Sequence, residues 1–168
     1  MGLRLQRRQL SRTFRAVALD LCAQGVRLSK SMPRANDLSL GPLAAGPGED
    51  EELHFDWMDN AVVRPWTTSE DAAALVREAL ALCSRPDELA TVIWSPFEAG
   101  VRLRSRDLAG HALILLDRDW TTWIVAARPS CWIIQIGLRS RTVAFSPNVP
   151  LRTDSNHRRQ GADLVPDS

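Results

Sequence analysis

The chain has 168 residues, of which 45% are apolar, and its 21 basic and 20 acidic residues leave a net charge of +1. This composition excludes a wholly disordered chain, a collagen-like repeat and a coiled coil, and it offers no overall charge that would attract nucleic acid or a membrane. The longest apolar run, Ala112–Leu116, is far shorter than the roughly 18–20 residues that a membrane-spanning helix needs.

The residue types that carry most chemistry form no site motif. Three cysteines and three histidines are scattered without a CxxC or HxxxH pair, so we expect neither a disulfide framework nor a metal site. The sequence has no Gly-rich phosphate loop, GxSxG elbow or HExxH motif. We therefore expect no cofactor and assign no catalytic residue, and the sequence leans away from an enzyme. Sparse cysteines and the lack of a signal-peptide pattern favour a cytoplasmic protein.

Residues 1–48 form a basic arm that ends in a linker. They hold eight basic and two acidic residues, and a helix over residues 3–24 would place arginines opposite an apolar stripe. The stripe consists of Leu10, Phe14, Val17, Ala18 and Leu21. The segment from Gly41 to Gly48 is rich in glycine and proline and therefore predicts a linker.

Three interpretations of the arm compete. In the first, it is a helix docked on the following domain, or an extension upstream of a start at Met32. In the second, residues 1–31 are a mitochondrial transit peptide, because such peptides are amphipathic, rich in arginine and poor in acids. In the third, residues 1–34 contact an anionic membrane surface or nucleic acid.

An acidic run follows the linker. Residues 49–59 hold six acidic and no basic residues, and an expected strand at 53–57 lies inside them because apolar and polar residues alternate there. Acidic side chains beside a tryptophan suit contact with an Arg-rich partner protein, although a solvated linker has the same composition. The candidate partner contacts in this run are Glu51, Glu52, Asp56 and Trp57.

Residues 69–84 have the clearest helix signal in the chain. Thr67 and Glu70 have the spacing of a capping box, and Pro86 ends the helix. Apolar residues recur at helical spacing and form one face, composed of Ala72, Leu75, Val76, Ala79, Leu80 and Cys83. We expect this face to cover a sheet.

The rest of the expected domain predicts β-strands. β-branched and aromatic residues gather in further runs, at residues 91–94, 101–104, 112–116, 120–127 and 131–138. Short connections make the last three runs an antiparallel meander over residues 111–138. Five of the six tryptophans fall in or beside the expected strands, which indicates a tryptophan-rich sheet.

These elements predict one α+β domain over residues 49–141, after the arm and linker of residues 1–48. Prolines and polar residues dominate from Thr142 onward, so we expect residues 142–168 to be a disordered tail. The expected fold is a small antiparallel sheet of about five to six strands, covered on one face by one main helix, with flexible N- and C-terminal extensions.

Two further groups of polar residues are candidates for function. Arg102 and Arg104 share one face of an expected strand, where they would bind a phosphate or an acidic partner, or simply face solvent. His111, Asp117 and Asp119 are the pocket candidates, because they are the polar groups able to supply acid/base chemistry between helix 69–84 and the sheet. A structural histidine and two solvated hairpin carboxylates are the plainer interpretation.

In architecture, residues 53–138 resemble the small α+β immunity and antitoxin-type modules of bacterial conflict systems, which pair one capped helix with an aromatic-rich antiparallel sheet. Our first hypothesis is an intracellular module without a catalytic motif, which binds another, basic protein through its acidic strand and sheet face. One alternative is a small-molecule-binding or hydrolytic domain. The other is organelle targeting or nucleic-acid contact through the arm.

Overall fold

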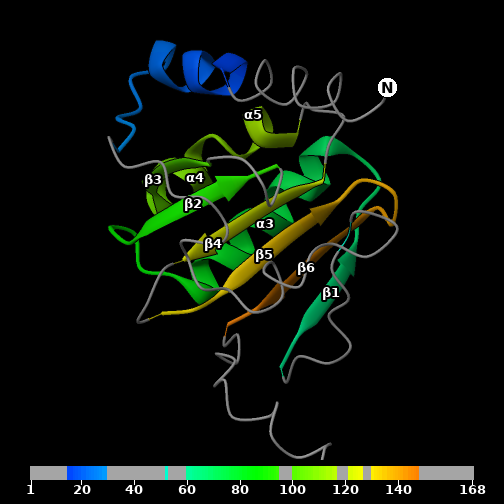
Figure 1. Cartoon of the computed structure of the whole chain (residues 1–168). Coiled ribbons are helices and arrows are strands. Elements are labelled where there is room, and N and C mark those ends of the chain that lie inside the picture. Colours follow the sequence, from blue (N-terminus) through cyan, green and yellow to red (C-terminus); the bar gives the residue numbers. More distant parts are fainter. Residues whose placement is uncertain are drawn as a thin grey trace, which may run out of the picture.

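Six antiparallel strands form the sheet at the centre of the molecule, in the order β1-β6-β5-β4-β2-β3 (Figure 1). The computed structural model describes residues 15–29, 52, 60–94, 100–116, 121–126 and 130–147. The strands are β1 (Val62–Pro65), β2 (Leu89–Ile93), β3 (Val101–Arg104), β4 (Thr122–Ala126), β5 (Ile133–Gly137) and β6 (Thr142–Ser146). The predicted α+β fold with a single antiparallel sheet is confirmed.

The described helices pack on one face of this sheet. They are α3 (Ser69–Cys83), α4 (Ser105–Gly110), α5 (Ala112–Leu116) and a helix at residues 15–23. One apolar core contains buried side chains from all four helices and alternate strand residues such as Ile124, Ile134 and Val143. Figure 1 shows α3 against the sheet and residues 15–23, coloured blue, on the same side of the molecule as α5.

The central strands are buried on both faces. Every residue of β4 and β5 is buried, and their sequences are rich in β-branched and aromatic residues, as suits strands covered on both sides. The edge strand β1 is mostly exposed and ends at Pro65. Proline is tolerated at an edge because its missing N–H interrupts no ladder between two strands.

The predicted strands at 91–94, 101–104, 120–127 and 131–138 are confirmed as β2, β3, β4 and β5. The strand expected at 53–57 lies outside the described residues. β1 was not among the expected strands, because its four residues, which include a proline, carry too short a pattern.

The expected strand at 112–116 is wrong, because these residues form helix α5. An apolar run of five residues has no periodicity that separates a strand from a buried helix. In the helix, Ala112, Leu115 and Leu116 have the i, i+3, i+4 spacing of one face, and all three are buried in the core. The three-stranded meander therefore consists of β4, β5 and β6 instead of residues 111–138.

The predicted disordered tail is wrong for its first five residues. Thr142–Ser146 form β6, which pairs with β5 on one side and with β1 on the other. Val143 and Phe145 alternate onto the helical face and enter the core. The prolines that follow this strand dominated the composition and hid its β-branched pattern.

Helix α3 confirms the prediction for residues 69–84, with its cap shifted by one residue. Thr68, not Thr67, is the N-cap, and its hydroxyl accepts from the backbone N–H of Asp71 at 3.1 Å. The Asp71 carboxylate accepts in return from the backbone N–H of Thr68 at 3.1 Å. Two threonines are followed by two acids, so either Thr67 with Glu70 or Thr68 with Asp71 has the spacing of a capping box. The structure uses Thr68 with Asp71.

Candidate functional site

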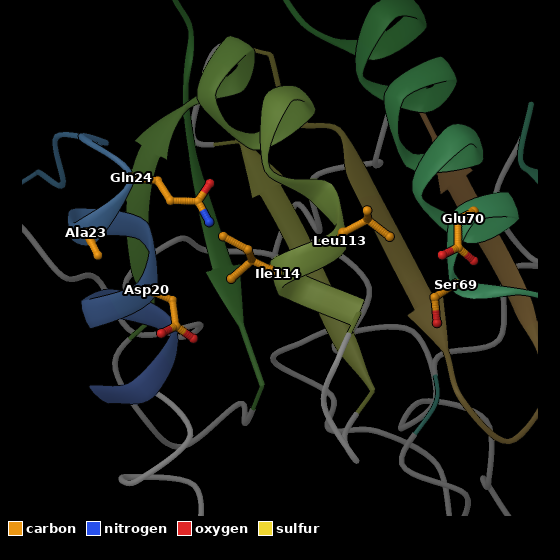
Figure 2. Close-up of a pocket in the computed structure, with 7 residues that line it drawn as sticks. All are labelled: Asp20, Ala23, Gln24, Ser69, Glu70, Leu113 and Ile114. Atoms are coloured by element: carbon orange, nitrogen blue, oxygen red, sulfur yellow. The ribbon is translucent and has the colours of Figure 1, made fainter.

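A cleft opens on the helical side of the molecule where three elements meet (Figure 2). Its volume is about 560 Å³. We call it the acidic cleft, and its lining residues are Asp20, Ala23, Gln24, Ser69, Glu70, Leu113 and Ile114. In Figure 2 the α5 residues lie between those of the helix at 15–23 and those at the start of α3.

The first wall is the helix at residues 15–23, which apolar side chains attach to the body. Val17 and Leu21 are completely buried in the shared core, whereas Asp20 is exposed. Beyond the helix, the N–H of Ser29 donates to the carbonyl of Arg102 in β3 at 2.8 Å. These contacts support the interpretation of the arm as a helix docked on the domain, for the part of the arm that the structure describes.

Gly25 ends this helix in the left-handed conformation, with a φ of 81°. Its N–H donates to the carbonyl of Cys22 at 3.0 Å, and the N–H of Val26 donates to the carbonyl of Leu21, also at 3.0 Å. These two bonds form a Schellman motif, which needs a residue without a Cβ penalty at the position of Gly25. The motif redirects the chain so that Val26 is also buried in the core.

The second wall is the first turn of α3. Because Thr68 is the N-cap, Ser69 and Glu70 are the first two helical residues, and both line the cleft. A helix N-terminus is equivalent to roughly +0.5 of an elementary charge. Asp20 and Glu70 are the acidic residues among the seven that line the cleft, and the seven include no lysine, arginine or histidine. Asp20 also makes a further interaction within the chain.

The apolar part of the cleft comes from α5. Leu113 is 46% exposed and Ile114 is partly buried against the core. A molecule bound in the cleft would therefore contact both the apolar side chain of Leu113 and the acidic residues on either side of it. The arrangement suits a group with an apolar stem and a cationic head.

The cleft does not have the ligands of a metal site. Within the described ranges, no group of three or more His, Cys, Asp or Glu side chains is placed to hold a metal ion. Hard cations such as Ca²⁺ normally take six or more oxygen ligands, well beyond the two acidic side chains here.

Among the residues that the structure describes, no helix is long and apolar enough to cross a bilayer.

Glu52, one of the predicted partner contacts, faces the turn between β5 and β6. It is 9% exposed, and its Oε1 accepts from the backbone N–H of Arg139 at 2.9 Å and of Ser140 at 3.3 Å. A Cβ added at Gly137 would lie 2.7 Å from the other carboxylate oxygen, so glycine leaves the space that Glu52 occupies. The carboxylate stabilises the turn, a role that its place in the acidic run did not indicate.

Arg102 and Arg104 share one face of β3, as expected from their spacing. Arg104 contacts the carboxylate of Asp87 at 3.3 Å, and Arg106 from α4 reaches the same oxygen at 2.8 Å. All three side chains are at least half exposed, so these ion pairs contribute little to stability. The arrangement fits the solvated interpretation of Arg104.

His111 is the C-cap of α4 and is not part of a strand, although the sequence predicts a meander over residues 111–138. Its backbone N–H donates to the carbonyl of Asp107 at 3.1 Å, and its ring Nδ1 donates to the same oxygen at 2.9 Å. The ring therefore caps the C-terminal end of α4. The remaining candidates lie outside the described residues and stay predictions: Glu51, Asp56, Trp57, Asp117 and Asp119.

The cleft lies beside the start of α3. Val76 and Leu80 of α3 and Val143 of β6 belong to the buried core between this helix and the sheet. Asp20 lies off the apolar stripe of the arm, and the sequence pattern assigns Glu70 to the helix cap, so the sequence predicts neither as a site residue. Their shared position depends on the docking of the helix at 15–23, which no local pattern encodes.

Comparison of this chain with protein-family models, curated proteins and solved structures finds no match in any of the three.

Proposed function

We propose that this chain is a non-enzymatic module that binds another protein, and that the acidic cleft takes a basic segment of that partner. The observation that carries the proposal is the position of Asp20 and Glu70. They come from two helices far apart in the sequence, and they line one cleft whose apolar part includes the exposed Leu113. This combination matches the chemistry of an arginine or lysine side chain.

A bound arginine would use both parts of the cleft. Its aliphatic stem would lie on Leu113 and Ile114, and its guanidinium would pair with a carboxylate at one end of the cleft (Figure 2). The hydroxyl of Ser69 and the amide oxygen of Gln24 are further acceptors along the same walls. Complementary charge of this kind gives specificity and fast association more than high affinity.

The proposal keeps the first hypothesis from the sequence, a basic protein partner, and adds a second acidic surface to the one predicted at Glu51 and Asp56. The likeness to immunity and antitoxin-type modules supports a protein partner only as an architectural analogy.

The test uses a fluorescent peptide of alternating arginine and leucine as the probe, with a peptide that has glutamate in place of arginine as its control. We expect the full chain to bind the arginine peptide, and the double variant Asp20→Asn, Glu70→Gln to bind it about three- to tenfold more weakly, as loss of two exposed charge pairs implies. Raising the salt concentration should weaken binding by the wild-type chain.

Glu78→Gln is the matched control, because Glu78 is an exposed glutamate of the same helix that does not line the cleft. It should leave peptide binding unchanged. Equal binding by the wild-type chain and the double variant would overturn the proposal, and so would an equal loss in Glu78→Gln.

A further inference from the structure

The sheet face away from α3 is buried, although the described helices all pack on the opposite face (Figure 1). We call it the outer face. Trp123 and Gln135 are each 2% exposed there, and Ile133 is completely buried. The buried residues that alternate onto this face are Thr91, Ile93, Trp123, Val125, Ile133, Gln135, Ala144 and Ser146. Another part of the chain therefore has to cover the outer face.

The covered area is confined to the middle of the sheet. Val63 lies on the outer face opposite Ala144, in the edge strand β1, and is 54% exposed. At the other edge, the Arg104 side chain in β3 is 50% exposed. Between the edges, Gln135 and Ser146 each make a further interaction within the chain. A strip of this shape suits one extended segment that crosses the central strands.

Glu52 places one end of such a segment on the outer face. Side chains alternate along β5, so position 137 shares the outer face with Gln135. A Cβ added at Gly137 would point to this face and lie 2.7 Å from Oε2 of Glu52. The other carboxylate oxygen accepts from the backbone N–H of Arg139 at 2.9 Å. The Glu52 side chain is therefore held over the outer face at the turn between β5 and β6.

The start of β1 lies at the opposite end of the sheet. Val62 pairs with Phe145 near the end of β6, whereas Pro65 pairs with Thr142 beside the turn. Between residue 52 and β1 the chain therefore has to run the length of β6. At about 3.3 Å per residue, the eight steps from residue 52 to residue 60 reach about 26 Å, whereas β6 and one further residue span roughly 17 Å. The connecting segment is long enough to cross the outer face.

We propose that residues 53–59 cross the outer face in an extended conformation, with Leu53, Phe55 and Trp57 packed on it. Apolar and polar residues alternate in this segment, and a period of two places these three side chains on one side of an extended chain. Large aromatic side chains bury roughly 150–250 Å² each, which suits a face that already contains Trp123. The inference does not depend on the acidic cleft.

This arrangement changes what the acidic run of residues 49–59 offers to a partner. The outer face is occupied by the chain itself and is closed to other molecules. Phe55 and Trp57 serve the fold, whereas Asp56 is on the opposite side of the segment and stays at the surface. A basic partner would therefore meet carboxylates over β5 and β6, and such charges contribute to specificity and association rate more than to affinity.

Nuclear Overhauser contacts in the isotopically labelled full chain test the proposal without any substitution. The indole N–H of Trp123 and the methyl groups of Ile133 should show contacts with the side chains of Leu53, Phe55 and Trp57. Contacts from the outer face to residues 95–99 or 148–168 in their place would assign the cover to another segment and overturn the proposal. Absence of contacts with residues 53–57 would overturn it as well.

Trp57→Ala and Met58→Ala are a matched pair, because they shorten neighbouring apolar side chains that point to opposite sides of the segment. Trp57→Ala should lower the midpoint of thermal unfolding by several degrees, whereas Met58→Ala should leave it within about 2 °C. Phe55→Leu is a milder variant in case Trp57→Ala fails to fold, and it should lower the midpoint in the same direction. Equal shifts in a variant of the apolar side and in Met58→Ala would contradict the packing of Phe55 and Trp57 on the sheet.

Discussion

Trp123 and Gln135 are directly opposite each other in β4 and β5, and the indole Nε1 of Trp123 donates a 2.7 Å hydrogen bond to Oε1 of Gln135. Each residue is only 2% exposed. They lie on the sheet face away from α3, since the alternate residues Ile124 and Ile134 belong to the core on the helical side. The pair is thus a satisfied polar contact buried on that face of the sheet.

Gln135→Leu should destabilise the protein, because it leaves the buried indole N–H of Trp123 without its acceptor. Leaving a buried polar group unsatisfied costs about 1–3 kcal/mol. Urea unfolding followed by circular dichroism measures the change in the free energy of unfolding. The double variant Trp123→Phe, Gln135→Leu should cost less than the sum of the two single variants, since the second change removes the orphaned donor. If the double variant costs as much as the two single variants together, the hydrogen bond contributes no coupling energy between Trp123 and Gln135.

Thr68→Ala should lower the free energy of unfolding by about 1 kcal/mol, the usual cost of losing an N-cap side chain. Thr67→Ala is the control, because Thr67 donates a hydrogen bond to the Asp71 carboxylate but is not the N-cap. We expect it to cost less than Thr68→Ala in the same unfolding assay. A larger loss of stability in Thr67→Ala than in Thr68→Ala would make Thr67 the N-cap, as the sequence pattern predicts.

The same cap predicts a pH dependence. A hydrogen bond from the side chain of Thr67, followed by bonds from the backbone and side chain of Thr68, holds the pKa of Asp71 below its usual 3.8. Because the folded-state pKa is lowered, the contribution of Asp71 is present above pH 3.8 and is lost as the pH falls through the lowered value. Unfolding measured from pH 6 down to acid should therefore show a shallower loss of stability in Asp71→Asn than in the wild type.

Gly137→Ala should destabilise the turn between β5 and β6, because the new Cβ would lie 2.7 Å from the Oε2 atom of Glu52. Thermal unfolding should show a lower midpoint in this variant. Glu52→Ala should also lower the midpoint, since it removes the acceptor for the N–H groups of Arg139 and Ser140. In the Glu52→Ala background, Gly137→Ala should cost less, because one of its two clashing neighbours is gone. An unchanged cost would place Glu52 away from Gly137.

Cys83 should react slowly with iodoacetamide at pH 8. Burial raises the pKa of its thiol from 9.0 to about 11, and the charge of Glu88 adds to the effect, so little of the reactive thiolate forms. The exposed Cys22 should be alkylated first, as peptide mass spectrometry of the labelled chain would show. Labelling of Cys83 as fast as Cys22 in the folded protein would contradict this assignment.

The raised pKa of Cys83 also predicts a loss of stability in alkaline solution. A thiol that stays neutral in the folded state contributes fully below pH 9, and this contribution is lost as the pH rises through about 11. The wild-type chain should therefore lose stability between pH 9 and 11 more steeply than Cys83→Ala. Parallel pH profiles for the two proteins would show that the thiol plays no part.

The elements with local signals could be predicted from the amino-acid pattern. Helix α3 has its cap, its apolar face and its end within one segment, and β2 to β5 have β-branched runs long enough to recognise. Tertiary packing decided α5, because its five-residue apolar run fits a helix or a strand until its neighbours select one. It also decided β6, which lies beside a proline-rich segment and is defined by its pairing with β5 and β1. The acidic cleft also depends on packing, since Asp20 and Glu70 line one surface only when Val17 and Leu21 pack the helix at residues 15–23 on the core. Local patterns encode elements, and the burial of side chains between distant segments determines which surfaces those elements share.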